Sequence, residues 1–144
     1  MKHRIQRRSN IFLMEIILSI LFFSIASAIC IRLFAQAHMQ SEHTAALNQA
    51  VLAASSAAEA LETCGGAAEE LSVSFPYSQA EGQTLHVYYD SAWKPCASAD
   101  TVWQMDVILS DSGGLLRGDI TVSGDGGETV IYTLTTEYYR GNGS

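Results

Sequence analysis

Residues 7–31 read RRSNIFLMEIILSILFFSIASAICI, and the rest of the chain is organised around this stretch. The stretch is basic at its start and then apolar, with one carboxylate, Glu15, inside the apolar run. The 21 residues 11–31 are just long enough to span a hydrocarbon core of about 30 Å. A carboxylate inside such a segment is costly unless it is paired or protonated. Glu15 is therefore the most informative residue of the sequence.

The residues before the apolar run form a short cationic leader. Four of these ten residues are basic, namely Lys2, Arg4, Arg7 and Arg8. Positively charged flanks stay in the cytoplasm, so the C-terminal part is expected on the other side of the membrane. We predict a single-pass cell-membrane protein with a leader over residues 1–10 and a transmembrane helix over residues 11–34, surrounded by membrane lipid.

The helix is expected to continue beyond the membrane, over residues 35–64. Residues 32–62 contain ten alanines and neither glycine nor proline, and alanine is the best helix former. Gly65 and Gly66 then provide a plausible C-terminal stop. Apolar residues at helical spacing predict one face that packs on the remaining domain. This expected stripe consists of Leu47, Val51, Leu52, Ala54, Ala58 and Leu61.

Residues 65–144 change in character and predict a small antiparallel sheet. Short runs rich in Val, Ile, Thr, Tyr and Trp alternate with Gly, Asp and Ser clusters. We expect strands over residues 84–90, 102–110, 115–123 and 129–139, with glycine-containing hairpin turns at 111–114 and 124–127. The expected fold is α+β: a long N-terminal helix packed on an antiparallel meander of three or four strands.

The charge of the chain is sharply divided. Beyond Arg32 there are three basic residues against fourteen acidic ones, a net charge of −11. Direct nucleic-acid binding is not expected of this part, because phosphate recognition requires clustered Lys and Arg. An acidic, solvated surface is the simpler interpretation.

Two of the three cysteines lie beyond the membrane segment. Cys64 and Cys96 can form one disulfide outside the cytoplasm, closing a loop of about 30 residues and stabilising the fold by about 3–4 kcal/mol. Two free thiols are the alternative. Cys30, within the apolar run, is interpreted as a small apolar residue.

Three features together resemble the type IV pilin and pseudopilin family. They are the cationic leader, the apolar helix with an acid at its fifth residue, and the domain that opens on that helix. That family includes subunits of type II secretion systems and Gram-positive competence pili. Aligning the family's glutamate with Glu15 places the prepilin-peptidase cut between Asn10 and Ile11. The resemblance implies that Glu15 meets the new N-terminal amine of a neighbouring subunit, here that of Ile11, as the helices bundle.

The sequence departs from the family at the cleavage site. Asn10 stands where the family has Gly, and Ile11 replaces the usual Phe or Met. Both a cleaved and an uncut chain therefore stay open. The expected function is that of a structural, minor pilin-like subunit in a filament for secretion, DNA uptake or adhesion, with other pilin-like subunits and prepilin peptidase as partners.

Two other non-enzymatic interpretations stay open. Ala26, Ser27 and Ala28 form a small-x-small site at which a signal peptidase would release a chain beginning at Ile29. Alternatively, the helix is an ordinary anchor that displays an adhesin or sensor domain without polymerising.

An enzyme is not expected. His38 and Glu42 lie four residues apart and could together contact a metal, but a solvated helix face explains them more simply. The sequence lacks a Ser/His/Asp grouping, a phosphate loop, a CxxC motif and EF-hand spacing. No catalytic residue, metal or cofactor is therefore predicted.

Overall fold

The computed structural model describes residues 2–140, with side chains from Arg8 onward. The fold is α+β, with one long N-terminal helix, α1 (Lys2–Thr63), and a five-stranded antiparallel sheet. By its internal contacts the chain divides into two compact units, Met1–Thr44 and Ala45–Ser144. The predicted fold class is confirmed.

The described residues of the first unit, 2–44, are all helical. The sequence predicted a helix from Ile11, whereas α1 already begins at Lys2 and includes the basic leader. Residues 2–44 contain no glycine or proline, so nothing in the covalent structure interrupts the helical hydrogen bonds. The bond between Asn10 and Ile11 consequently lies inside the helix.

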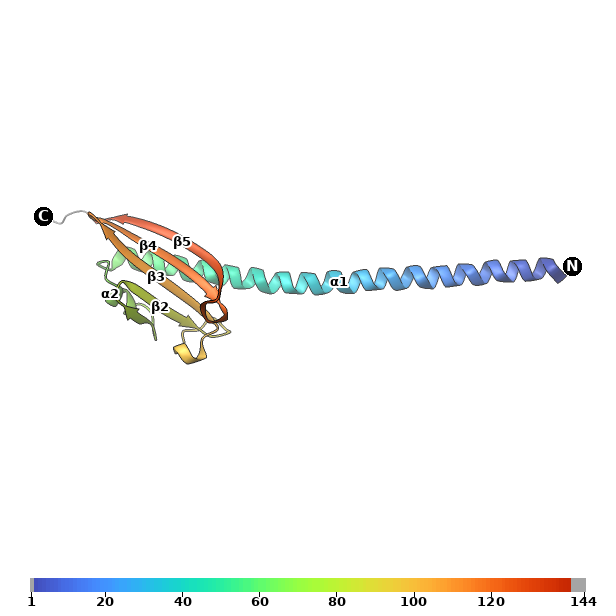
Figure 1. Ribbon diagram of the computed structural model, residues 1–144, viewed down its shortest axis with the longest axis horizontal. Coiled ribbons are helices and arrows are strands. Elements are labelled where there is room, and N and C mark those ends of the chain that lie inside the picture. The colour runs from blue at the N-terminus through green and yellow to red at the C-terminus, as the bar shows by residue number, and fades with distance from the viewer. Residues whose placement is uncertain (1, 141–144) are drawn as a thin grey trace. The chain divides into compact units, whose positions relative to one another are not determined.

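The second unit holds the C-terminal part of α1, the sheet and three short helical segments. The strands follow one another as an antiparallel meander in the order β1-β2-β3-β4-β5 (Figure 1). Their bounds are β1 Gln79–Glu81, β2 Thr84–Tyr89, β3 Trp103–Ser112, β4 Leu115–Gly124 and β5 Thr129–Tyr139. The short helices are α2 (Ala68–Ser72) and the 3₁₀ turns Ser98–Asp100 and Asp125–Gly127.

Glycines make the turn that separates the two long central strands. β3 and β4 are joined by Gly113 and Gly114, whose φ angles are +65° and +92°. Positive φ at both central residues is the requirement of a type I′ hairpin, and glycine meets it without steric cost. The two-residue turn fixes the register, in which Ser112 pairs with Leu115.

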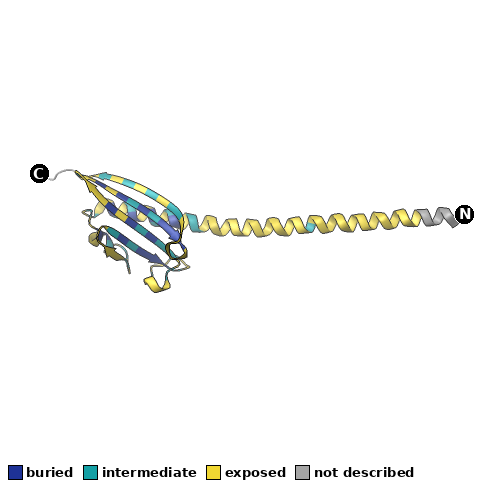
Figure 2. Ribbon diagram, in the orientation of Figure 1, coloured by how far each residue is buried: buried dark blue, intermediate teal, exposed yellow. Residues whose placement is uncertain are grey.

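The core lies between the sheet and an alanine face of α1. Ala50, Ala54, Ala57 and Leu61 are at most 1% exposed and recur every three or four residues. They pack in the same core cluster as the inward-facing strand residues, where Figure 2 shows the buried positions. These strand residues are Leu85, Val87, Tyr89, Met105, Val107, Leu109, Leu116, Ile120 and Val122.

The helix face that contacts the sheet differs in part from the expected stripe. Ala54 and Leu61 are buried as predicted, but Leu52 is 61% exposed, and Ala50 and Ala57 are buried instead. The reason is visible at Gly118, where an added Cβ would lie 2.5 Å from Leu61 Cδ2. The helix approaches the sheet so closely that small residues are required along the contact.

The sheet is also larger than expected. The four predicted strands are present within one or two residues of their expected ends, and a fifth strand, β1, pairs with β2. The three residues of β1 are all exposed, so they lack the alternation that reveals a strand in sequence. No sequence pattern predicted the short helix α2, which begins three residues after Gly65.

Candidate functional site

The apolar segment of α1, residues 11–34, is solvent-exposed in the isolated chain. Every large apolar side chain between residues 11 and 34 is exposed, from 41% at Ile16 to 82% at Phe34. The mean hydropathy of its most apolar 18-residue window is 2.4. By length and composition this helix can cross a membrane, a test that a signal sequence near the N-terminus would also pass. Apolar surface of this extent requires lipid or protein around it.

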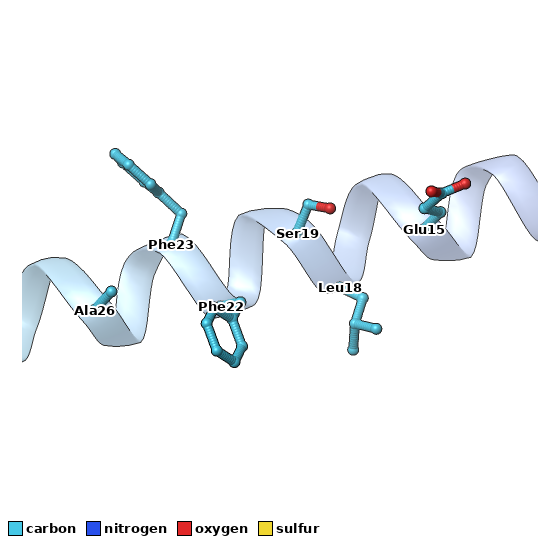
Figure 3. Close-up of a pocket in the computed structure, with 6 residues that line it drawn as sticks. All are labelled: Glu15, Leu18, Ser19, Phe22, Phe23 and Ala26. Atoms are coloured by element: carbon cyan, nitrogen blue, oxygen red, sulfur yellow. The ribbon is translucent and has the colours of Figure 1, made fainter.

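Glu15 lies in an open groove along this segment. The groove is lined by Glu15, Leu18, Ser19, Phe22, Phe23 and Ala26. Figure 3 shows Ser19 and Phe23 projecting to one side of this helix face and Leu18 and Phe22 to the other. Glu15 and Ser19 are one helical turn apart, which makes a short polar stretch within the apolar surface.

Within the part of the chain whose side chains are described, residues 8–140, no ion pair or hydrogen bond reaches the Glu15 carboxylate. A carboxylate can accept up to about four hydrogen bonds and prefers a cationic donor. In water the solvent satisfies these needs, but hydrocarbon cannot. Whatever surrounds the groove in a membrane must therefore neutralise or hydrate this one group.

Asn10 and Ile11, the predicted cleavage site, are exposed on the same helix. Both residues lie inside α1, with helical turns on either side. Ile11 is 65% exposed. A peptidase that reads an extended backbone would have to unwind about one turn of the helix to reach this bond.

Cys64 and Cys96, the possible disulfide pair, are not bonded to each other in this structure. Cys64 directly follows α1 and precedes Gly65, whose carbonyl accepts a hydrogen bond from Arg140 at one end of the sheet. Cys96 donates its N–H to the Tyr88 carbonyl at the other end.

The sheet register separates the neighbourhoods of these two thiols. Tyr88 is opposite Gln104, whereas Leu116, beside Gly66, is opposite Asp111. The step of seven residues along β3 from Gln104 to Asp111 corresponds to about 23 Å. A disulfide requires Cα atoms about 4–7 Å apart.

The outer face of the sheet carries a polar network that the sequence did not reveal. His86 in β2 and Asp106 in β3 are directly opposite each other, with Nδ1 and Oδ1 2.6 Å apart. Gln104 Nε2 donates to the same Asp106 oxygen at 2.7 Å. His86 Nε2 also lies 3.8 Å from a carboxylate oxygen of Glu81 on β1. Only the strand register, which sequence patterns do not give, brings these side chains together.

A second polar group lies on β4 and β5. Asp119 accepts hydrogen bonds from Thr135 at 2.8 Å and from Arg117 at 3.2 Å. The hydrogen bond from Thr135, followed by that from Arg117, lowers the pKa of the Asp119 carboxyl below its ordinary value. Arg117 also lies 3.8 Å from Glu137. These contacts lie at the surface and link side chains of neighbouring strands. We interpret them as structural cross-strand contacts.

Aromatic side chains close the end of the sheet near the Cys96 loop. Trp93 stacks on Trp103 with ring centroids 4.9 Å apart and planes inclined by 12°. Trp93 adopts a positive φ of +60°, held by a turn in which Asp90 Oδ1 accepts the N–H groups of Ala92 and Lys94. Burial, with the charges of Asp90 and Asp100, raises the pKa of the Cys96 thiol. That thiol is therefore mostly protonated, and poorly nucleophilic, at neutral pH.

The His38–Glu42 pair, which could contact a metal, has no third ligand beside it among the described residues. His38 Nε2 and Glu42 Oε1 are 3.4 Å apart, and both side chains are more than 70% exposed. Across the described residues, no three His, Cys, Asp or Glu side chains come together as a metal site would require. The pair has the geometry of an ordinary i,i+4 contact on a solvated helix.

Comparison with known proteins gives no match. No family model, no curated protein and no solved structure matches the chain. The site must therefore be interpreted from its own residues, and Glu15 in its exposed apolar groove is the feature that requires a functional explanation.

Proposed function

We propose that the chain is a structural, pilin-like membrane subunit that assembles with other pilin-like subunits through the apolar part of α1. In this proposal the leader is cytoplasmic, residues 11–34 cross the membrane, and the second unit lies outside the cell membrane. The filament would be of the type IV pilus, type II secretion or competence kind, with this chain as a minor component. The resemblance over residues 7–31 supports the choice of family.

The observation that carries the proposal is Glu15 as the single charged residue in the exposed apolar segment 11–31 of α1. Lipid can cover the apolar side chains around it, but lipid tails cannot compensate a carboxylate. A neighbouring helix that supplies a cation satisfies both requirements at once. An anchor that only spans the membrane has no use for this charge, so Glu15 favours a subunit over a simple anchor.

The proposal predicts that Glu15→Gln and Glu15→Ala strongly reduce assembly while the second unit folds normally. The substitutions remove a charge-assisted contact, and each loss of about 1.4 kcal/mol lowers the association constant about tenfold. We expect the fraction of chain recovered in sheared filaments, or co-purified with other pilin-like subunits, to fall about tenfold or more.

Glu42→Gln is the matched control, because it makes the same chemical change on the same helix outside the apolar segment. It should assemble like the wild-type chain. Normal incorporation of the Glu15 variants would refute the proposed mechanism. Failure to recover any pilin-like partner would instead favour the anchored adhesin or sensor.

A further inference from the structure

The basic residue nearest to Glu15 among those whose side chains are described lies just before the apolar segment. Arg8 is exposed, and it is the last basic residue before Arg32 along the chain. Both Arg8 and Glu15 belong to the first unit and to the same uninterrupted helix. Arg8 lies just before the apolar surface, and Glu15, of opposite charge, lies within it.

Arg8 and Glu15 lie on one face of α1 but cannot meet within one chain. Seven residues amount to just under two helical turns, so their directions differ by only about 20°. The same seven residues separate them by about 10.5 Å along the axis. No ion pair joins them in the described part of the chain. Each charge therefore faces outward at the same side, available to a second helix.

Two parallel copies of this helix are complementary when one is displaced by seven residues. Glu15 of the first copy then lies level with Arg8 of the second, and the apolar faces stay in contact because a seven-residue shift preserves the face. An arginine can bind a carboxylate through two parallel N–H donors, which makes it a suitable counter-ion in a dry environment.

We propose that the chain assembles uncut, with the Glu15 carboxylate of each copy bound by the Arg8 guanidinium of a copy displaced outward by seven residues. This inference rests on the proposed function and names the partner of its central residue. Because both groups lie on one face of each helix, the contact extends to further copies when that face points to a common axis and each copy is displaced by seven residues from the last. The group that binds Glu15 is then a side chain and does not depend on a new N-terminus.

The local structure at residues 10 and 11 supports retention of Arg8. The bond between Asn10 and Ile11 is enclosed by helix on both sides, whereas proteolysis is concentrated in loops and frayed ends. Asparagine is also a better helix residue than glycine, which lowers the tendency of this turn to open. Cleavage at this bond would remove Arg8 from the chain.

The first test is the intact mass and N-terminal sequence of the chain in membranes and in sheared filaments. The proposal expects residues 8–10 to be present in both fractions. A chain that begins at Ile11 in filaments would overturn the inference. The proposed function would survive that result, because it depends on the separate loss of assembly in Glu15→Gln.

The second test exchanges the charges. Arg8→Gln should lower assembly about tenfold or more, Arg8→Lys should retain most of it, and the double variant Arg8→Glu/Glu15→Arg should recover assembly that each single variant loses. Arg32→Gln is the matched control at the other end of the apolar segment and should assemble normally. Equal assembly of Arg8→Gln and wild type, or no recovery in the double variant, would overturn the pairing.

A change of membrane orientation must be separated from a loss of pairing, because Arg8 is also one of the leader's charges. Digestion of the second unit by protease added outside intact cells reports orientation. The proposal expects unchanged digestion for Arg8→Gln alongside its lost assembly. An inverted orientation that accounts for the loss in this variant would count against the pairing.

Discussion

At the scale of single residues, burial decides how Tyr89 responds to pH. Tyr89 ends β2, is 8% exposed, and lies with its ring centroid 5.9 Å from that of Trp93. Burial raises the pKa of its hydroxyl to about 12 from the ordinary value of 10.0. In the unfolded chain the hydroxyl ionises two pH units earlier. The folded state is therefore favoured by this group below pH 10, and the contribution is lost as the pH rises through 12.

We expect Tyr89→Phe to make the folded chain less sensitive to alkaline pH. The wild-type free energy of unfolding should fall by about 2 kcal/mol more than that of the variant between pH 10 and pH 12, because each pKa unit corresponds to about 1.4 kcal/mol and part of the effect lies outside this range. Urea unfolding of the full-length chain in detergent, followed by tryptophan fluorescence, measures this difference. Tyr139→Phe, at a 79% exposed position, controls for the loss of one hydroxyl. Parallel pH profiles for wild type and Tyr89→Phe would contradict the expectation.

At the scale of elements, the contact between α1 and the sheet depends on small residues on both sides. Ala50, Ala54 and Ala57 face the sheet, and Gly118 in β4 makes room for Leu61. The Tyr138 hydroxyl in β5 donates to the Ala58 carbonyl at 3.0 Å, which also requires a short distance between helix and strand. Such close contact leaves no free volume for an added methyl group.

Gly118→Ala should destabilise the second unit by about 1–3 kcal/mol, because its Cβ would overlap the buried Leu61 side chain. Leu61→Ala alone should cost about 2–5 kcal/mol through a cavity. The double variant should cost less than the sum of the two, because truncation of Leu61 removes the overlap. Denaturant titration of all four chains tests this, and strict additivity would show that the two residues do not compete for the same space.

The sequence predicted most of these elements, and the failures have identifiable causes. The long strands were recognisable because glycine clusters separate runs of β-branched and aromatic residues, as at Gly113 and Gly114. The exposed strand β1 had no such pattern. Leu52 was assigned to the contact because larger apolar residues are normally buried, whereas the close packing selects alanine. Glu15 can be recognised in the sequence because it is a single charge among apolar residues. The separation of Cys64 and Cys96 cannot, because it depends on the sheet register.

At the scale of the whole molecule, the charges are divided between the two ends of the chain. The leader is basic, whereas the residues beyond Arg32 carry a net charge of −11, from three basic and fourteen acidic residues. Positively charged flanks are retained in the cytoplasm. The proposed orientation therefore has its strongest physical support in Lys2, Arg4, Arg7 and Arg8 together.

Single added thiols test this orientation. A membrane-impermeant maleimide should label Ser98→Cys in intact cells, above the level of the wild-type chain. It should label Ser9→Cys only after permeabilisation, because the proposal places that residue in the cytoplasm. Both native positions are exposed, so access to the reagent is not limited by the fold. Labelling of Ser9→Cys in intact cells would show that the orientation is reversed.

The alanine face of α1 also determines how the second unit would carry a mechanical load. A pull along the helix axis acts on the helix–sheet contact in shear, and the alanine side chains along this contact offer no hydrogen bond to the strands. Resistance is then concentrated at the end of the helix. There Leu61 fits over Gly118, Tyr138 holds the Ala58 carbonyl, and Arg140 holds the Gly65 carbonyl. The last helical turn and the residues that follow it therefore bear most of such a load.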